Sequence, residues 1–306
     1  MKKNWIKSYS KYTPETVDLN EFDSIIDLFE KSCYEFSNNS AYVNMGVSLS
    51  YKELNEKTKA FASFIQNELN MKKGDRLAIM MPNLLQYPIA LFGAMRAGII
   101  IVNVNPLYTA GELKHQLNDS GSTAIVILEN FCHVLEECIE NTPIKHVITT
   151  EIGDMFSLTK RTLVNFVVKK IKKMVPNFSI DSAIPFRKAL NIGTFNTFHH
   201  IKLTHRDIAF LQYTGGTTGV SKGAALNHKN MIANMQQAHA WLNFDKGKET
   251  VITALPLYHI FALTANCLVF LRLGGCNILI TNPRDIPLFI KTLKKVFLQN
   301  IDINVK

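Results

Sequence analysis

The chain has 306 residues, a length that allows one large α/β domain or two smaller ones. Hydrophobic residues make up 47% of it and charged residues 19%, which is ordinary for a globular protein with a sizeable apolar core. The formal net charge of +9 favours anionic partners, whether small phosphorylated molecules, acidic lipids or nucleic acid.

No segment is suited to secretion or to crossing a bilayer. The N-terminus begins with charged residues and lacks a following apolar region, so it does not read as a secretory signal. The longest apolar stretches, residues 260–271 and 88–104, are too short or are interrupted by Arg96. Five scattered cysteines, without a Cys-x-x-Cys pair or zinc spacing, suit free buried thiols in a reduced, cytosolic chain.

Helical and strand-like patterns alternate along the first half of the chain. Helices are expected at 22–36, 51–69, 84–96, 112–117 and 133–140. Short apolar runs predict strands at 76–81, 97–103, 124–128 and 146–149. Ser50 is the expected N-cap of the second helix, with Glu53 in the capping-box position. The alternation predicts an α/β fold with parallel-sheet layers covered by helices on both faces.

The alternation breaks between about residues 153 and 203, where Pro, Asn, Phe and Lys are mixed irregularly. Within this stretch, residues 160–173 carry six basic side chains and no acidic one. One face of a helix there would hold Leu163, Phe166, Val167, Ile171 and Met174. A basic amphipathic helix suits docking on an anionic membrane surface. The alternative is a helix packed on the domain with a solvated lysine face, and composition does not separate the two.

The alternation resumes with an apolar strand at 208–212, and a polar, glycine-rich run follows it. Further elements are expected in this order: a helix at about 229–241, a strand at 251–255, a helix after Tyr258, a strand at 277–280 and a helix at about 286–297.

The glycine-rich run reads YTGGTTGVSKGA and combines four glycines, three threonines, a serine and a lysine. Glycines let the backbone approach an anion, and successive N–H groups form an anion-binding nest. Hydroxyls and an ammonium group add hydrogen bonds and charge. Placed between a strand and a helix, the run predicts a phosphate-cradling loop for a nucleotide triphosphate. The candidate ATP-binding residues are Tyr213, Thr214, Gly215, Gly216, Thr217, Thr218, Gly219, Val220, Ser221, Lys222, Gly223 and Ala224.

Other kinds of glycine-rich loop fit this spacing less well. A Walker loop, Gly-x-x-x-x-Gly-Lys-Ser/Thr, fails because Lys222 is followed by Gly223 rather than by a hydroxyl residue. A dinucleotide fingerprint, Gly-x-Gly-x-x-Gly, fails because Gly215 and Gly216 are adjacent. A plain turn is the remaining alternative, but nest-forming loops with this many hydroxyls mainly serve anions.

The run resembles the phosphate-binding loop of the acyl-adenylate-forming enzymes, which include acyl-CoA synthetases, firefly luciferase and the adenylation domains of peptide synthetases. Residues 254–264, ALPLYHIFALT, resemble the second core motif of that superfamily. Segments similar to its early conserved blocks are 81–88, 96–98, 104–108 and 117–121. The strongest resemblance is to bacterial long-chain fatty acid–CoA ligases and extends from the N-terminus to about Lys294, carried by NPLY at 105–108, PLYHIF at 256–261 and TNPRD at 281–285.

This resemblance implies a reaction in two steps. A fatty acid carboxylate attacks the α-phosphate of ATP to give acyl-adenylate and pyrophosphate, and the thiol of coenzyme A then displaces AMP. The resemblance also places His259 beside the acyl carboxylate as a catalytic candidate, whereas a lone His at such a position is often a packed core residue. Phe261, Leu263 and Leu268 are candidates for lining an acyl tunnel, although an apolar stripe at helical spacing is more often core.

Three parts of the family pattern are not found in the sequence. They are a Tyr-Gly-x-Thr-Glu block whose Glu would help hold magnesium, a Thr-Gly-Asp block whose Asp would hold the ribose, and a C-terminal domain with a catalytic lysine. We therefore expect residues 1–306 to be a truncated N-terminal AMP-binding domain with little ligase activity alone. ATP and Mg²⁺ are the expected cofactors, coenzyme A the co-substrate, and no metal ligand is assigned within the chain.

Two other functions remain open at this point. One is another acyl- or aryl-CoA ligase, and the other is a non-catalytic chain that binds nucleotide or lipid. Nucleic acid is not an expected partner, because the positive charge permits it but no recognised motif supports it. We expect a cytoplasmic chain that contacts the inner face of the membrane peripherally through residues 160–174.

Overall fold

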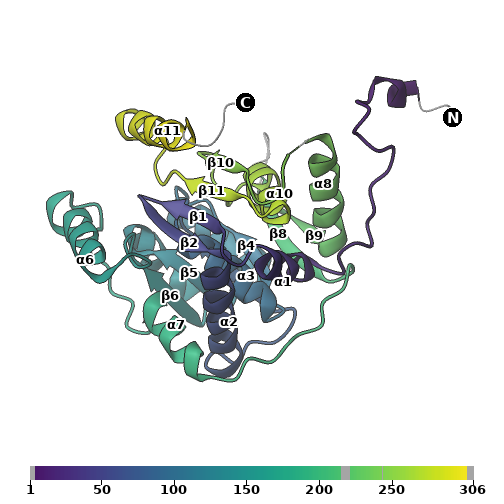
Figure 1. The fold of residues 1–306 in the computed structure, drawn as a ribbon. Helices are drawn as coiled ribbons and strands as arrows, with labels where there is room; N and C mark the ends of the chain where they lie inside the picture. The colour runs from purple at the N-terminus through teal and green to yellow at the C-terminus, as the bar shows by residue number, and fades with distance from the viewer. Residues whose placement is uncertain (1–3, 215–220, 243, 302–306) are drawn as a thin grey trace.

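Two β-sheets and the helices on their faces make up the computed structural model, which describes residues 4–214, 221–242 and 244–301, with side chains to residue 296. Figure 1 shows the helices grouped around the sheets. The larger sheet has the strand order β7-β6-β5-β3-β4-β8-β9. Its strands are β3 (Arg76–Met80), β4 (Ile100–Asn103), β5 (Ala124–Leu128), β6 (His146–Thr150), β7 (Ile184–Pro185), β8 (Ile208–Thr214) and β9 (Lys222–Asn227).

The parallel sheet predicted from the apolar runs is confirmed. Every neighbouring pair in the larger sheet is parallel except β8 with β9. In the centre of the sheet, Ile79 of β3 pairs with Asn103 of β4 on one side and with Val126 of β5 on the other. All five residues of β5 are buried, as expected for a strand that helices cover on both faces.

Alternate residues of the central strands point to opposite faces of the sheet and pack into two separate hydrophobic cores. Leu77 and Ile79 of β3 belong to one core, and Ala78 and Met80 belong to the other. Helices of the first core include α1 (Ile25–Glu35), α2 (Tyr51–Asn67), α3 (Gln86–Arg96) and α7 (Phe186–Phe195). Helices of the second core are α4 (Ala110–Ser120) and α5 (Cys132–Glu136). The capping box expected at Ser50 and Glu53 starts α2.

The smaller sheet has the order β10-β11-β1-β2. The hairpin of β1 (Ser40–Asn44) and β2 (Val47–Ser50) is not visible in the sequence pattern, because the two strands are short. It turns at Met45 and Gly46, which both have positive φ. The other two strands of this sheet are β10 (Thr250–Thr253) and β11 (Cys276–Leu279). Three helices of this part of the chain, α8 (His228–Trp241), α9 (Ile260–Ala262) and α10 (Val269–Leu273), add buried residues to the first core, and α11 (Ile286–Ile301) is the last helix.

The glycine-rich run does not lie between a strand and a helix, so this expectation is wrong. Its second flank is a strand, β9, which pairs antiparallel with β8 from Thr214↔Lys222 onward. The small residues at the start of β9 have weak strand propensity, and the strand is an exposed sheet edge, so no apolar alternation reveals it. Helix α8 begins only at His228 and is capped by Asn227, not by the loop.

The stretch 153–203 is also more regular than expected. It contains α6 (Leu158–Phe166), which continues into the π-helical turn Val167–Ile171, and it contains α7. Buried residues of α7 follow helical spacing and pack against α2, and Gly193 lies so close that an added Cβ would stand 1.9 Å from the Ala60 carbonyl oxygen. Polar residues between these apolar positions mask the periodicity.

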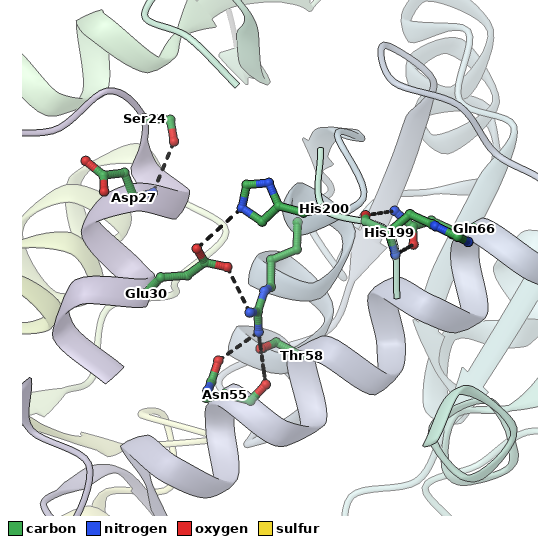
Figure 2. A network of polar contacts seen from close by, with 9 residues as sticks. Ser24, Asp27, Glu30, Asn55, Thr58, Gln66, His199 and His200 are labelled. Atoms are coloured by element: carbon green, nitrogen blue, oxygen red, sulfur yellow. Dashed lines mark hydrogen bonds and ion pairs between the residues drawn. The ribbon is translucent and has the colours of Figure 1, made fainter. Parts of the chain in front are cut away.

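A buried arginine joins three helices of the first core. The Arg96 side chain, which is 7% exposed, forms an ion pair of 2.8 Å with Glu30 of α1 and donates to the side chains of Asn55 and Thr58 of α2. His200 lies 3.6 Å from the other carboxylate oxygen of Glu30. Figure 2 shows these partners converging from α1, α2 and the segment before β8. The charge that interrupts the apolar stretch 88–104 is thus paired inside the fold.

Two further expectations agree with the structure. Within the described residues, no helix combines the length and the apolar character needed to cross a membrane. All five cysteines are free, and four of them are buried. Burial raises the pKa of the Cys33, Cys132 and Cys267 thiols to about 12, which leaves them protonated and unreactive at neutral pH.

Candidate functional site

The two flanks of the glycine-rich run lie at the carboxyl end of β8, the end at which ligands bind in parallel sheets. Tyr213 and Thr214 end β8, Ser221 precedes β9, and Lys222, Gly223 and Ala224 begin β9. The other six predicted ATP-binding residues, Gly215, Gly216, Thr217, Thr218, Gly219 and Val220, lie outside the described residues. The structure therefore describes the base of the loop.

Helix α4 holds both flanks of this loop. The Tyr213 hydroxyl donates a 2.5 Å hydrogen bond to Asp119, and the His115 Nε2 atom lies 3.0 Å from the Ser221 carbonyl oxygen. Burial, together with the Asp119 carboxylate, raises the pKa of the Tyr213 hydroxyl above its usual value, so the group remains a donor. His115 and Asp119 are one helical turn apart. Asp119 lies within the conserved-block segment 117–121, which carries no expected role for it, and His115 lies outside every motif of the sequence.

Close contacts fix the base of the loop further. The Ser221 hydroxyl donates to the Thr214 carbonyl oxygen at 3.0 Å. A Cβ atom added to Gly223 would stand 2.8 Å from two carbons of the Tyr213 ring. Gly223 therefore leaves room for the Tyr213 ring of the neighbouring strand β8. Ala224 and Lys222 are exposed, and Lys222 forms no ion pair with any described carboxylate.

On the opposite face of β8, Gln212 joins the loop to the second core motif. Its Nε2 atom donates to the Tyr258 carbonyl oxygen at 3.0 Å, and its Oε1 atom accepts from Asn103 at 3.2 Å. The Tyr87 hydroxyl lies 2.8 Å from Asn103 Oδ1 and 2.9 Å from the Leu257 carbonyl oxygen. Gln212, Asn103 and Tyr87 are all buried. Consecutive residues of β8 thus reach α4 on one side and the His259 segment on the other.

Asn83, which lies between β3 and α3, holds the same segment in place through hydrogen bonds. Its Oδ1 atom accepts from the Leu257 amide at 2.8 Å, and its Nδ2 atom donates to the carbonyl oxygens of Thr253 and Leu255 at 2.9 and 3.0 Å. Asn83 is 2% exposed, so these three backbone groups are its compensation for burial. Residues 81–88 and 254–264, which lie far apart in the sequence, are therefore in direct contact.

His259 is exposed, so the alternative of a packed core histidine is wrong. It caps α9, where its Nδ1 atom accepts from the Phe261 amide at 3.3 Å. Phe261 is 60% exposed beside it, whereas Leu263 and Leu268 are fully enclosed in the core. For these two leucines, the structure shows the core position that the sequence left open. Whether His259 meets an acyl carboxylate is not decided by these contacts and stays a prediction.

No metal centre is assigned around this loop. Over 4–214, 221–242 and 244–296, no group of three or more His, Cys, Asp or Glu side chains is arranged to hold a metal ion. A cavity of about 500 Å³ lies instead at α1 and α10, between Phe22, Tyr34, Lys246 and Arg272 among others, and none of the candidate site residues lines it.

Comparison with known proteins identifies relatives over nearly the whole chain. The family model described as AMP-binding enzyme matches residues 29–298. A long-chain-fatty-acid–CoA ligase of Escherichia coli O157:H7 is 54% identical over 297 residues, covering 96% of this chain and 53% of the relative. A protein of the same name from Haemophilus influenzae is 52% identical over 299 residues, with the same coverage of 96% and 53%. The chain thus spans about half the length of these curated relatives.

Solved structures share the fold, and one of them serves as an example. The crystal structure of an anthranilate CoA ligase in complex with anthranoyl-AMP superposes with a TM-score of 0.73 at 15% sequence identity. The superposition covers 87% of this chain and 47% of the other. The α/β architecture expected from the sequence, with sheets covered by helices, is therefore that of an adenylate-forming ligase domain.

Proposed function

Because the chain belongs to the AMP-binding enzyme family, we propose that it serves the ATP-dependent activation of long-chain fatty acids. In the first step, a fatty acid carboxylate oxygen bonds to the α-phosphorus of ATP and the bond to the bridging oxygen breaks, releasing pyrophosphate. In the second step, the sulfur of coenzyme A bonds to the acyl carbon and AMP leaves. Fatty acid, ATP and coenzyme A are the proposed partners, and residues 1–306 form the proposed N-terminal adenylating part.

One observation carries this proposal: Gln212 and Thr214 stand two residues apart at the end of β8. Gln212 holds the Tyr258 carbonyl beside this strand end, and Thr214 begins the glycine-rich loop. A triphosphate at the loop and a carboxylate at His259 would then approach the same strand end. Bringing two reactants together in this way is a large part of the catalysis of a bimolecular step.

The loop flanks supply groups suited to phosphate oxygens. The Thr214 hydroxyl and the Lys222 ammonium group are both on exposed residues at the strand ends. Hydrogen bonds to charged groups contribute about 1.5–3 kcal/mol each, so a few of them give usable affinity for ATP. We assign contacts to the β- and γ-phosphates to residues 214–222, with Lys222 as the point charge.

His259 is proposed to lie beside the acyl carboxylate. As the N-cap of α9, its ring is held by the Phe261 amide, and its exposure leaves the other edge of the ring accessible. A neutral imidazole oriented in this way can donate one hydrogen bond from Nε2. Such a bond would orient the carboxylate oxygen for attack on ATP.

Magnesium is the usual companion of ATP, but the described residues do not fit a protein-built site for it. The described side chains contain no cluster of three metal-binding groups. Because Mg²⁺ is commonly bound through substrate phosphates and only one or two carboxylates, it would enter with the nucleotide. No step proposed above passes through the metal. We propose a cytoplasmic location at the inner face of the membrane, with no nucleic acid among the partners.

ATP–pyrophosphate exchange that depends on palmitate or oleate tests this function. The purified chain is assayed alone and together with the part of the Escherichia coli relative that lies beyond the aligned segment. Exchange in either assay, by the chain alone or by the chain with the added part, supports the proposal if long-chain acids are preferred over aryl acids. Nucleotide binding without exchange in both assays would favour a non-catalytic binding protein, and a preference for aryl acids would favour another CoA ligase.

A further inference from the structure

Residues 158–174, named here the basic apolar helix, present their large apolar side chains to solvent. It consists of α6, the π-helical turn and the three residues after it, which are not helical and include Lys173 with positive φ. Its exposed apolar residues are Leu158 at 68%, Leu163 at 63%, Phe166 at 55%, Ile171 at 64% and Met174 at 48%. Figure 1 shows α6 at the margin of the molecule, set off from both sheets. Five such side chains on one short segment form an unusual exposed apolar patch.

The inner side of this helix packs on the core through the small apolar side chain of Val164 and is otherwise held by polar contacts. Asn165, which is 8% exposed, donates to Glu151 at 2.9 Å and accepts from the Gly153 amide at 2.8 Å. Lys169 forms ion pairs with Glu129 at 2.6 Å and with Glu151 at 2.5 Å. Burial opposes the charge of Lys169, but the two carboxylates outweigh it and raise the lysine pKa.

These contacts bear on one of the two interpretations left open by the sequence, that of a helix packed on the domain. A helix that packed on the domain through its apolar face would bury Leu163, Phe166 and Ile171, and this expectation is wrong. Instead, a lysine and an asparagine face inward, and the apolar side chains face outward. Four anchoring bonds hold the helix in this orientation, so the exposed face is a feature of the fold.

The outward side also carries unneutralised positive charge. Lys170, Lys172 and Lys173 are exposed, and none of them forms an ion pair with a described carboxylate. No acidic residue occurs between Asp154 and Asp181 in the sequence. Apolar side chains interleaved with lysines match the layered chemistry of a bilayer interface, with acyl chains below anionic headgroups.

We propose that the basic apolar helix docks the protein on an anionic lipid bilayer. Leu163, Phe166 and Ile171 insert at the boundary of headgroups and acyl chains, while the three lysines contact lipid phosphates. A protein partner fits less well, because protein interfaces are depleted in lysine at their centre and this helix offers a ridge rather than a groove. Fatty acids partition into bilayers, so docking would bring the chain to its proposed substrate. Only this benefit, and not the docking itself, rests on the proposed function.

Vesicle sedimentation tests the docking without ATP, fatty acid or coenzyme A. Failure of the exchange assay therefore leaves this result intact, and failure here leaves the exchange result intact. We expect the chain to sediment with vesicles of phosphatidylcholine and phosphatidylglycerol, not with phosphatidylcholine alone, and to dissociate as salt is added. Equal binding to both vesicles, or binding to neither, would overturn the proposal.

Variants locate the surface. Changing Lys170, Lys172 and Lys173 to Gln should weaken binding about fivefold for each lysine, roughly 100-fold together. The matched control changes three exposed lysines elsewhere, Lys52, Lys59 and Lys188, to Gln and should bind as the parent does. If the control loses as much affinity as the first variant, net charge and not this helix is responsible, and the proposal fails.

The apolar insertion has its own test. Phe166→Ser should weaken vesicle binding at least several-fold, because an inserted aromatic ring is replaced by a small polar group. Phe195→Ser is the control, since Phe195 is 82% exposed outside the basic apolar helix. In the variants Phe166→Trp and Phe195→Trp, brominated lipids should add tryptophan quenching only for the first. Quenching that is the same for both, or unchanged binding of Phe166→Ser, would contradict insertion.

Discussion

The hydroxyl of Tyr213 donates to the carboxylate of Asp119 across 2.5 Å, so the strand that leads into the glycine-rich loop is tied to α4. The other flank of the loop is tied to the same helix, because His115 lies 3.0 Å from the Ser221 carbonyl oxygen. The loop is therefore carried by two strands but oriented by a helix that contributes no residue to the glycine-rich motif itself.

Removing the Tyr213 hydroxyl should weaken this attachment. Tyr213→Phe is expected to lower the free energy of unfolding by about 1 kcal/mol, since the bond is partly exposed to solvent. A double-mutant cycle with Asp119→Asn, followed by urea denaturation, measures the coupling between the two side chains. Additive effects of the two changes would show that the contact contributes no stability.

Lys222→Ala and Thr214→Ala should each weaken ATP binding. Loss of a charged or hydroxyl donor to phosphate is expected to cost about 1.5–3 kcal/mol, roughly ten- to a hundredfold in dissociation constant. Isothermal titration calorimetry with ATP measures this directly. Lys229→Ala, an exposed lysine at the start of α8, is the control. Unchanged nucleotide binding in both loop variants would refute the assignment of the loop.

Gly223→Ala should disturb the loop through Tyr213 rather than through phosphate. The new Cβ atom would stand 2.8 Å from the ring, so the ring or β9 has to move. We expect ATP affinity to fall, and we expect Gly223→Ala to lower it by a smaller factor when it is introduced into Tyr213→Ala, where the ring is absent. If Gly223→Ala lowers ATP affinity by the same factor in both backgrounds, the steric explanation is wrong.

Gly193→Ala tests the contact of α7 with α2. Its Cβ atom would lie 1.9 Å from the Ala60 carbonyl oxygen, so the helices must separate, and overpacking of this kind costs about 1–3 kcal/mol. Gly111→Ala in α4 meets nothing within 4 Å and should instead stabilise the chain by up to about 1 kcal/mol. Guanidinium denaturation of both variants should show opposite signs, and equal shifts would contradict the close packing.

His228 should make stability depend on pH. Its Nδ1 atom accepts from the Ile25 amide at 3.1 Å, and burial lowers the pKa of His228 to about 4. Between pH 6.5 and 4 the unfolded chain binds a proton that the folded chain does not, so stability is lost as the pH falls. The loss is at most about 3 kcal/mol.

The measurement compares unfolding free energies of the parent and His228→Gln at pH 7 and pH 5. Other titrating groups are common to both proteins, so the difference between their pH slopes isolates His228. The parent should lose more stability than the variant on acidification. Parallel slopes would mean that the histidine titrates alike in the folded and unfolded chains.

Much of this architecture is predictable from local pattern alone. The buried strands β3, β4 and β5 each contain a continuous apolar run, and the second helix carries its own start signal in Ser50 and Glu53. Such signals are contained in a few neighbouring residues. The Arg96 partners are different, because Glu30 and Asn55 come from separate helices that only the fold brings together.

The sequence marks the candidate site residues by motifs, but it does not mark the scaffold that holds them. The loop flanks and the His259 segment are both marked by motifs, yet β9 is a strand of small exposed residues with no alternation. His115 and Asp119 each make a single contact with a loop flank, and such a contact between distant residues cannot be predicted from local sequence pattern. The orientation of the basic apolar helix was equally hidden, since the same apolar stripe fits a buried or an exposed face until Asn165 and Lys169 are seen to point inward.

The hydrogen bonds of Asn83 affect how the folded chain unfolds locally around the segment that leads to His259. The one amide of Asn83 satisfies three backbone groups of the segment that leads from β10 toward His259, so that segment is released only when all three bonds break together. We therefore expect the backbone amides around Asn83 and those of residues 253–257 to share their protection against hydrogen exchange, because they are lost in the same local opening. The Gln212 bond to the Tyr258 carbonyl oxygen would add the strand end of β8 to that unit.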